Sequence, residues 1–402
     1  MRAGRDDARR RALRDALQVV LPTALETDLL RVVLWQGEPG SEAWRRWRER
    51  AGDPLLAFER LHAGLKGLAP LLYVAARRNR LEIPQAFGSY LRAAYFREEL
   101  RGNAYRRILS DVLRGLAAAE LRPLVLKGEA LAATVYDDPK TRHSHGIELL
   151  VRRAQGARAA AILPALNFRP ARRRGLSGAG HASWRHGSGL PLELRTRLFG
   201  PEVYAVADEA LWSRSVDLRL GNTAAQALGR EHALLHVCAS AAMSASRSTL
   251  RWACDGWLLL RSRPEAFDWP LLVDAVAAAR LALPLAIMLR FLAEALAAPV
   301  PDSVLRQLEA KGGQSDDFEY ELALLCALPG VHDGLRRTLL AASGWSNRAA
   351  VLRALVAPSP AALRALDGDL PAAFLPLYYA GRPARYLARR LWRQRPAWAM
   401  RP

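Results

Sequence analysis

The chain has 402 residues, of which 51% are hydrophobic and 24% charged, so it can bury a core of ordinary size. Its formal net charge of +20 comes almost entirely from arginine, and the arginine clusters are spread along the whole chain. Binding of RNA or DNA by charge favours cations gathered on one face, so this spread makes the charge only weak support for a nucleic-acid partner.

Residues 1–120 are predicted to form a helical region. They begin with the charged segment MRAGRDDARRRALRD, which lacks the apolar stretch of a secretory signal, so we expect a cytoplasmic protein. Residues 41–51 open with a serine suited to an N-cap. Residues 54–78 and 84–121 carry apolar side chains at three- and four-residue spacing, which is typical of amphipathic helices.

Residues 121–222 are predicted to form a small mixed α/β core, because the apolar period changes there. RPLVL (122–126) and IELLV (147–151) have the pattern of short buried strands, and each precedes a predicted helix. Residues 181–198 have the pattern of a hairpin whose two strands join at HGSG. The predicted fold class is therefore α+β, with a small mixed sheet embedded between two mainly helical regions.

Residues 223–402 are predicted to form a second helical region with proline-containing joints, from AAQALGREHALLHVCASAAM to RPARYLARRLWRQR. The most apolar run, residues 281–300, is interrupted by proline and charged residues, so we expect a buried core helix and no membrane span. Cys238, Cys254 and Cys326 form no CxxC pair and are expected to be reduced core residues.

The middle region carries candidates for phosphate and metal chemistry. Nucleotidyl transfer needs metal ions that bridge a triphosphate, and carboxylates that hold those ions. Glu148 lies on the second predicted strand and Glu193 on a hairpin strand between apolar neighbours, so we expect the two to meet on the polar face of the sheet. Lys127 and Gly128 lie between the first strand and its helix, where backbone N–H groups can bind phosphate.

Two blocks of this region match a spaced pattern. The chain reads LVLKGEALAATVYDDPKTRHSHGIELLV and later LELRTRL. It thereby resembles a bacterial nucleotidyltransferase family of the polymerase-beta-like superfamily, whose members typically read LLKGxAL…LYxDPxxRxxxDIDLLV and then DLHWRL. ALLHVCAS…LRWACDGWLLL is similar to a helical segment that follows these blocks in the family.

The resemblance implies a nucleotidyltransferase-type sheet, with an NTP, ATP being expected, and Mg²⁺ as cofactors. It also implies transfer of NMP to an acceptor such as a small molecule, a sugar or a peptide. The residues that it assigns to catalysis and metal binding are Glu148 and Glu193, and those that it assigns to the nucleotide are Lys127, Gly128 and Arg142.

The chain departs from the family pattern where the chemistry lies. Asp-Ile-Asp of the family is Gly146-Ile147-Glu148 here, the third aspartate is Glu193, and the histidine that follows it is Arg195. Glycine removes a metal ligand. Each glutamate is one methylene longer than aspartate, which displaces a metal by about 1.5 Å, and octahedral Mg²⁺ tolerates such a shift poorly.

Two hypotheses follow from this incomplete carboxylate set. The first is an enzyme with a reshaped metal site. The second is a catalytically inactive pseudo-nucleotidyltransferase that serves as a binding or scaffold protein for a peptide, RNA or a partner enzyme.

Other polar residues have both a functional and a structural interpretation. Histidines that fall near the same region, and that could bind Zn²⁺ or Mn²⁺ in place of the lost ligand, are His143, His145, His181 and His186. Unliganded loop histidines are the more frequent case. Arg142 is a candidate to bind triphosphate or to pair with Asp137 or Asp138. Asp255 is a candidate to anchor Arg251 or the substrate groove, and a structural salt bridge is the expected role.

Overall fold

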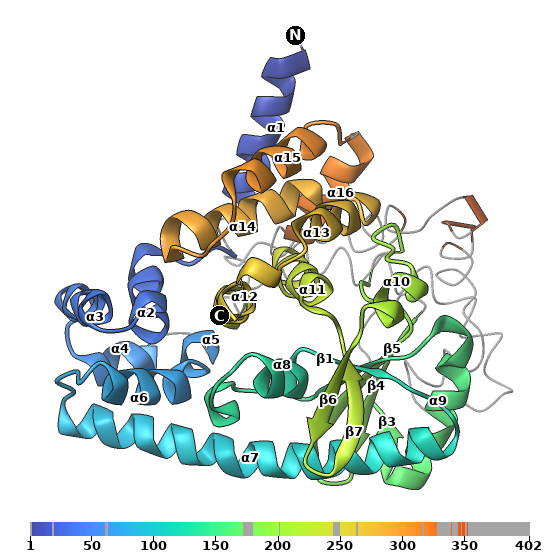
Figure 1. Cartoon of the computed structure of the whole chain (residues 1–402), viewed down its shortest axis with the longest axis horizontal. Helices are drawn as coiled ribbons and strands as arrows, with labels where there is room; N and C mark the ends of the chain where they lie inside the picture. The colour runs from blue at the N-terminus through green and yellow to red at the C-terminus, as the bar shows by residue number, and fades with distance from the viewer. Residues whose placement is uncertain are drawn as a thin grey trace, which may run out of the picture.

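The computed structural model describes residues 2–17, 20–60, 63–171, 180–200, 202–243, 250–262, 264–315 and 317–327, with isolated positions from 339 to 352. Within this part, helices surround a seven-stranded sheet (Figure 1). The predicted helix at RPARYLARRLWRQR lies outside the described residues.

The N-terminal part is helical, as its periodicity predicts. Its helices are α1 (Arg2–Leu17), α2 (Ala24–Leu34), α3 (Glu38–Ala51), α4 (Pro54–Arg60), α5 (Ala63–Lys66), α6 (Ala69–Arg78) and α7 (Gln85–Ala118). Stacked and edge-on aromatic rings join these helices, with Trp44 packed between Trp47 and Phe87. The long helix α7 runs beneath the whole of this part and on under the sheet (Figure 1).

The sheet has the order β3-β4-β5-β2-β1-β7-β6. Its strands are β1 (Leu124–Leu126), β2 (Ile147–Leu150), β3 (Phe168–Pro170), β4 (His181–His186), β5 (Pro191–Arg195), β6 (Val216–Leu220) and β7 (Thr223–Ala227). The connecting helices are α8 (Gly128–Thr134), α9 (Gly156–Ile162) and α10 (Asp208–Ser213), with short 3₁₀ turns at Pro139–Thr141, Arg153–Gln155 and Leu163–Leu166. β1 pairs with β7 and β2 with β5 in parallel, while the other neighbours are antiparallel, so the sheet is mixed.

The two faces of the sheet pack against different cores, because successive side chains on a strand point to opposite sides. Val125, Ile147 and Leu149 join the core formed with α7 and α9. Leu126 and Leu150 join the larger core formed by the N-terminal and C-terminal helices. Glu148 alternates with Ile147 and Leu149, so it lies on the side of the larger helical core.

The C-terminal part returns to helices. They are α11 (Arg230–Ala242), α12 (Arg251–Arg261), α13 (Trp269–Ala278), α14 (Ala282–Leu296), α15 (Asp302–Gly312) and α16 (Asp317–Ala327), with a 3₁₀ turn at Pro264–Ala266. α14 is buried along most of its length, which confirms the core helix predicted for residues 281–300. Cys238, Cys254 and Cys326 are free and buried, as predicted. None of the described helices combines the length and apolar character that crossing a bilayer requires.

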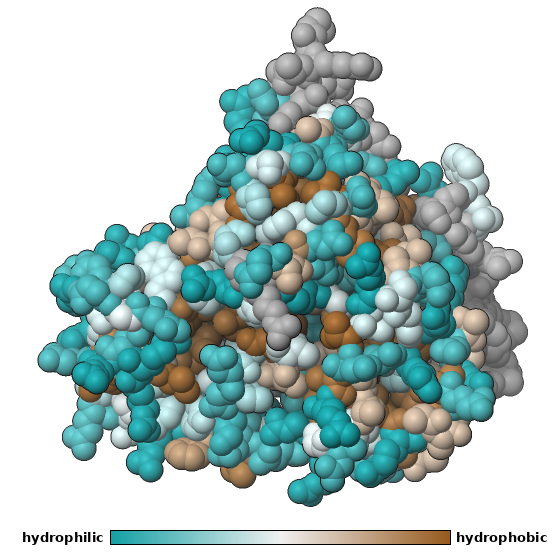
Figure 2. All heavy atoms as spheres, viewed as in Figure 1, coloured by the Kyte–Doolittle hydropathy of each residue, from teal (hydrophilic) through white to brown (hydrophobic). Residues whose placement is uncertain are grey.

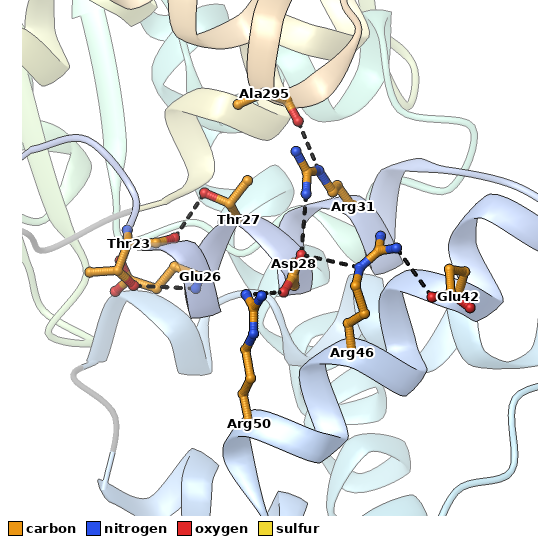
Figure 3. A network of polar contacts seen from close by, with 9 residues as sticks. All are labelled: Thr23, Glu26, Thr27, Asp28, Arg31, Glu42, Arg46, Arg50 and Ala295. Carbon is orange, nitrogen blue, oxygen red and sulfur yellow. Dashed lines mark hydrogen bonds and ion pairs between the residues drawn. The ribbon is translucent and has the colours of Figure 1, made fainter.

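A polar network fastens the N-terminal helices to the C-terminal ones (Figure 3). Thr23 and Glu26 form a capping box that starts α2, with each side chain accepting from the other's backbone N–H. The buried Asp28 pairs with Arg31 and Arg50, at 3.2 and 2.8 Å. Arg31 also donates to the carbonyl of Ala295 near the end of α14, at 2.9 Å, which ties α2 to α14.

The regions predicted as 1–120, 121–222 and 223–402 differ in secondary structure, and their division into domains stays a prediction. β7 carries the sheet on to Ala227, beyond residue 222.

Figure 2 shows hydrophilic side chains over most of the visible face, with apolar residues gathered towards its middle.

Candidate functional site

The two predicted acids meet on the sheet. β2 and β5 run in parallel with Glu148 directly opposite Glu193, and both side chains lie on the face turned towards the C-terminal helices. Each side chain is partly shielded, Glu148 being 25% and Glu193 30% exposed. Two carboxylates in adjacent register positions repel each other unless nearby cations compensate them.

Glu148 is compensated by two basic side chains. Arg195, two residues after Glu193 on β5, forms an ion pair with Glu148 between Nη2 and Oε2 at 3.2 Å. Burial alone would raise the pKa of Glu148, but the attraction of Lys127 and Arg195 outweighs it, and the pKa lies below its ordinary value. Glu148 is therefore held ionised by the protein's own cations.

Glu193 is held by the neighbouring hairpin strand. Ser183 lies opposite Glu193 in the β4–β5 register, and its hydroxyl donates to the two carboxylate oxygens at 2.9 and 2.8 Å. The Nε2 atom of His181 makes a further contact with Oε2 of Glu193. Ser183 and His181, both on β4, are thus partners of Glu193.

The glycine at position 146 is packed tightly. A Cβ atom built on Gly146 would lie 2.7 Å from the carbonyl oxygen of Pro191 and 2.9 Å from its Cγ. Contacts this short with backbone require the strands to move apart. The chain therefore lacks both the carboxylate at position 146 and the space in which a side chain would sit.

The corner after β1 has a strained backbone at Lys127, whose φ of +44° is rare for a residue with a side chain. Gly128 begins α8. A Cβ atom built on Gly128 would lie only 2.7 Å from Oγ of Ser144, so glycine leaves room for this hydroxyl. The first turn of α8 already carries the buried acid Glu129. Gly128 thus admits the loop before β2, and the carboxylate of Glu129 pairs with Arg106 of α7 at 3.6 Å.

Arg142 is engaged in a buried network. Its guanidinium donates twice to Asp255 of α12, from Nε at 2.9 Å and from Nη2 at 2.8 Å. Tyr136 donates to the same carboxylate at 2.7 Å. Asp255 forms the predicted structural salt bridge, and its partner is Arg142. The pairing of Arg142 with Asp137 or Asp138 was wrong, because the Nε and Nη2 atoms of Arg142 are both directed at Asp255. Arg142 therefore links the sheet region to the C-terminal helices.

The four loop and strand histidines do not gather at the acid pair. His181 contacts Glu193, but His143 pairs with the buried Glu98 of α7, Nδ1 to Oε2 at 2.6 Å. His145 packs edge-on against His143, and His186 packs against Phe168 beside the other core. Across the described residues, no group of three or more histidine, cysteine or acidic side chains is arranged to hold a metal ion.

The residues at the acid pair do not fit Mg²⁺. Mg²⁺ requires an octahedral shell of oxygen ligands. Here Arg195 is in ion-pair contact with Glu148 and Lys127 lies near enough to lower the pKa of Glu148, so a divalent ion would meet repulsion from both basic groups. The space for a third carboxylate at Gly146 is filled by Pro191.

Sequence reasoning identified Glu148, Glu193 and Lys127 but gave no role to Arg195 or Ser183. A signal for both was present. Glu193 and Arg195 are two positions apart on one strand, which places them on the same face, and His181 and Ser183 alternate in the same way on the paired strand. The packing of Pro191 against Gly146 had no such signal, because it depends on strand register.

The sequence model of a protein family described as "Uncharacterised nucleotidyltransferase" matches residues 62–297, more than half of the chain. That range includes the whole sheet and the helices α11 to α14. No curated protein matches the chain.

Proposed function

The chain belongs to this nucleotidyltransferase family, and we propose that it acts as a binding or scaffold protein that does not carry out metal-dependent nucleotidyl transfer. In this role the sheet and the helices around it serve as the structural support for a binding surface. The acid pair serves as part of an internal charge network, and partners of the kind expected from the sequence are a peptide, RNA or another enzyme.

The observation that carries the proposal is the internal neutralisation of the acid pair. Glu148 is paired with Arg195, and Glu193 is held by Ser183 and His181. Metal-dependent transfer needs carboxylates whose charge is met by the metal ions. A guanidinium in ion-pair contact with one of the two acids occupies that place with a positive charge, and it has no coordination positions with which to join carboxylate and phosphate oxygens as a metal ion does.

A second candidate function is NMP transfer from an NTP to a small-molecule, sugar or peptide acceptor. Two observations favour it. Glu148 and Glu193 stand side by side in register, and the Oε2 atom of Glu148 accepts no hydrogen bond from the described residues, although it is in the ion pair with Arg195. In this case Arg195 would have to move away when a nucleotide and metal bind.

The experiment that separates the two functions incubates the purified full chain with each labelled NTP and Mg²⁺ or Mn²⁺. Release of pyrophosphate and labelling of the protein are measured. The proposal predicts no turnover above that of Glu148→Gln, which retains the shape of the side chain but loses its charge. Turnover that Glu148→Gln abolishes would establish transfer and overturn the proposal.

A further inference from the structure

A cavity of about 300 Å³ lies between the sheet and the C-terminal helices, on the Lys127 side of the acid pair. β1 and α8 form one wall, the β6–β7 pair another, and α11 and α12 cover it (Figure 1). Its apolar lining includes Val125, Leu131, Val135, Ala233, Val237 and Leu259. An apolar lining with a few polar groups is typical of small-molecule sites.

Lys127 lines this cavity and brings a charge to it. The side chain of Lys127 makes no hydrogen bond or ion pair with the residues that the structure describes. Burial lowers the pKa of Lys127, and the attraction of Glu148 only partly opposes that effect. An ammonium group in such a position is stabilised by an anion placed next to it.

The other ionisable lining groups leave the cavity positive. Arg230 adds a second positive charge and Asp217 one negative charge, so Lys127, Arg230 and Asp217 together carry a formal charge of +1. His236 also lines the cavity and is neutral at pH 7, because burial and the nearby cations hold its pKa well below its ordinary value. Glu148, whose charge Lys127 shares with Arg195, does not line the cavity, so an anionic group on a ligand would be a second counterion for Lys127 on the cavity side.

We propose that this cavity binds a small amphipathic anion, a molecule with an apolar body and one carboxylate or phosphate group that pairs with Lys127. The size of the cavity limits the body to about ten atoms of the size of a water molecule. Such a ligand lies at the small end of those that protein pockets enclose.

This inference rests on the proposed function in one respect, since it leaves Lys127 available for a ligand other than a triphosphate. The two claims fail separately. Nucleotide turnover would overturn the proposed function, whereas the cavity is tested with probes in a solution that contains no nucleotide and no metal.

The test uses para-fluorobenzoate as the probe, followed by fluorine NMR in the presence of the full chain. Two anionic competitors are tested, benzoate for the carboxylate group and phenyl phosphate for the phosphate group. Benzamide is the neutral competitor, with the same shape as benzoate. We expect at least one of the anions to displace the probe, with an affinity about tenfold or more above that of benzamide, because hydrogen bonds to a charged group are the stronger ones. The stronger competitor assigns the anionic group.

Variants separate the cavity from the basic surface. Lys127→Met retains the length of the side chain and should weaken probe binding about tenfold, whereas Lys66→Met, the same change at an exposed position, should leave it unaltered. Ala233→Leu fills the cavity without changing any charge and should abolish binding, so it decides the question if Lys127→Met fails to fold. No displaceable binding, or equal binding by wild type and Ala233→Leu, would overturn the proposal.

Discussion

Single buried charges determine much of the behaviour of this protein at the scale of the residue. Arg142 and Asp255 form a two-point salt bridge in which both side chains are almost fully buried, at 6% and 4% exposed. Such a pair brings little net stability by itself, but removal of one partner leaves the other charge buried and unpaired. The pair joins the loop before β2 to α12, so its loss should be felt in the whole fold.

Asp255→Asn is therefore expected to lower the free energy of unfolding by about 3–5 kcal/mol. Asp111→Asn is the matched control, because Asp111 forms an exposed pair with Arg114 and surface pairs contribute about 1 kcal/mol or less. Denaturant unfolding followed by circular dichroism measures both. Equal small losses in the two variants would contradict the role given to Asp255.

The buried His236 makes stability depend on pH. Its imidazole is protonated in the unfolded chain near the ordinary pKa of 6.5, but in the folded protein only at lower pH, because of burial and the repulsion of Lys127 and Arg195. Between the two pKa values the unfolded state binds more protons. The contribution of His236 to the free energy of unfolding is therefore fully present above pH 6.5. As the pH drops below 6.5, this contribution falls by up to about 1.4 kcal/mol per pH unit.

His236→Gln lacks this titration. The difference in unfolding free energy between wild type and His236→Gln should therefore shrink as the pH is lowered from 7 to 5, measured by denaturant unfolding at each pH. A difference that stays constant or grows on acidification would show that His236 titrates at an ordinary pKa.

At the scale of the element, the strand pair β2–β5 explains why glycine stands at position 146. The two strands are close enough that Pro191 fills the space beside Gly146. Gly146→Ala should lower the free energy of unfolding by about 1–3 kcal/mol through overpacking. Gly200→Ala is the control, since nothing lies within 4 Å of its added Cβ, and surface substitutions of this kind change stability by about 0.5 kcal/mol or less.

Thermal and denaturant unfolding of the two variants measure this difference. If Gly146→Ala were as stable as Gly200→Ala, the space at position 146 would be open, and an aspartate there could complete the carboxylate set.

The elements were largely readable from the sequence, and their partnerships less so. Short apolar runs predicted the strands at 122–126 and 147–151, and the glycines and serine of HGSG between two extended segments predicted the hairpin at 181–198. Sequence reasoning missed the β6–β7 pair that completes the sheet: residues 216–220 do alternate apolar and polar side chains, but the alanine-rich partner strand at 223–227 lacks a strong strand pattern. Nor did it predict that Arg142 would reach Asp255, a contact across 113 positions.

At the scale of the molecule, the fold surrounds its acid pair with its own cations. The sheet brings Arg195 and Lys127 to Glu148, and the hairpin brings His181 and Ser183 to Glu193. The network at Arg31 and Ala295, together with the bond from Trp35 to the Leu296 carbonyl, holds the N-terminal helices against the helices that cover this face. The two acids could be identified from the sequence. The basic and polar side chains beside them could not, because these residues meet only when the strands pair.

The binding of Mn²⁺ by the full chain, measured by electron paramagnetic resonance of the free ion, tests this compensation most directly. With Lys127 and Arg195 already beside the acids, we predict no stoichiometric binding at micromolar Mn²⁺, and no difference between wild type and the double variant Glu148→Gln with Glu193→Gln. One or two Mn²⁺ ions bound per chain by the wild type, and lost in the double variant, would contradict the account.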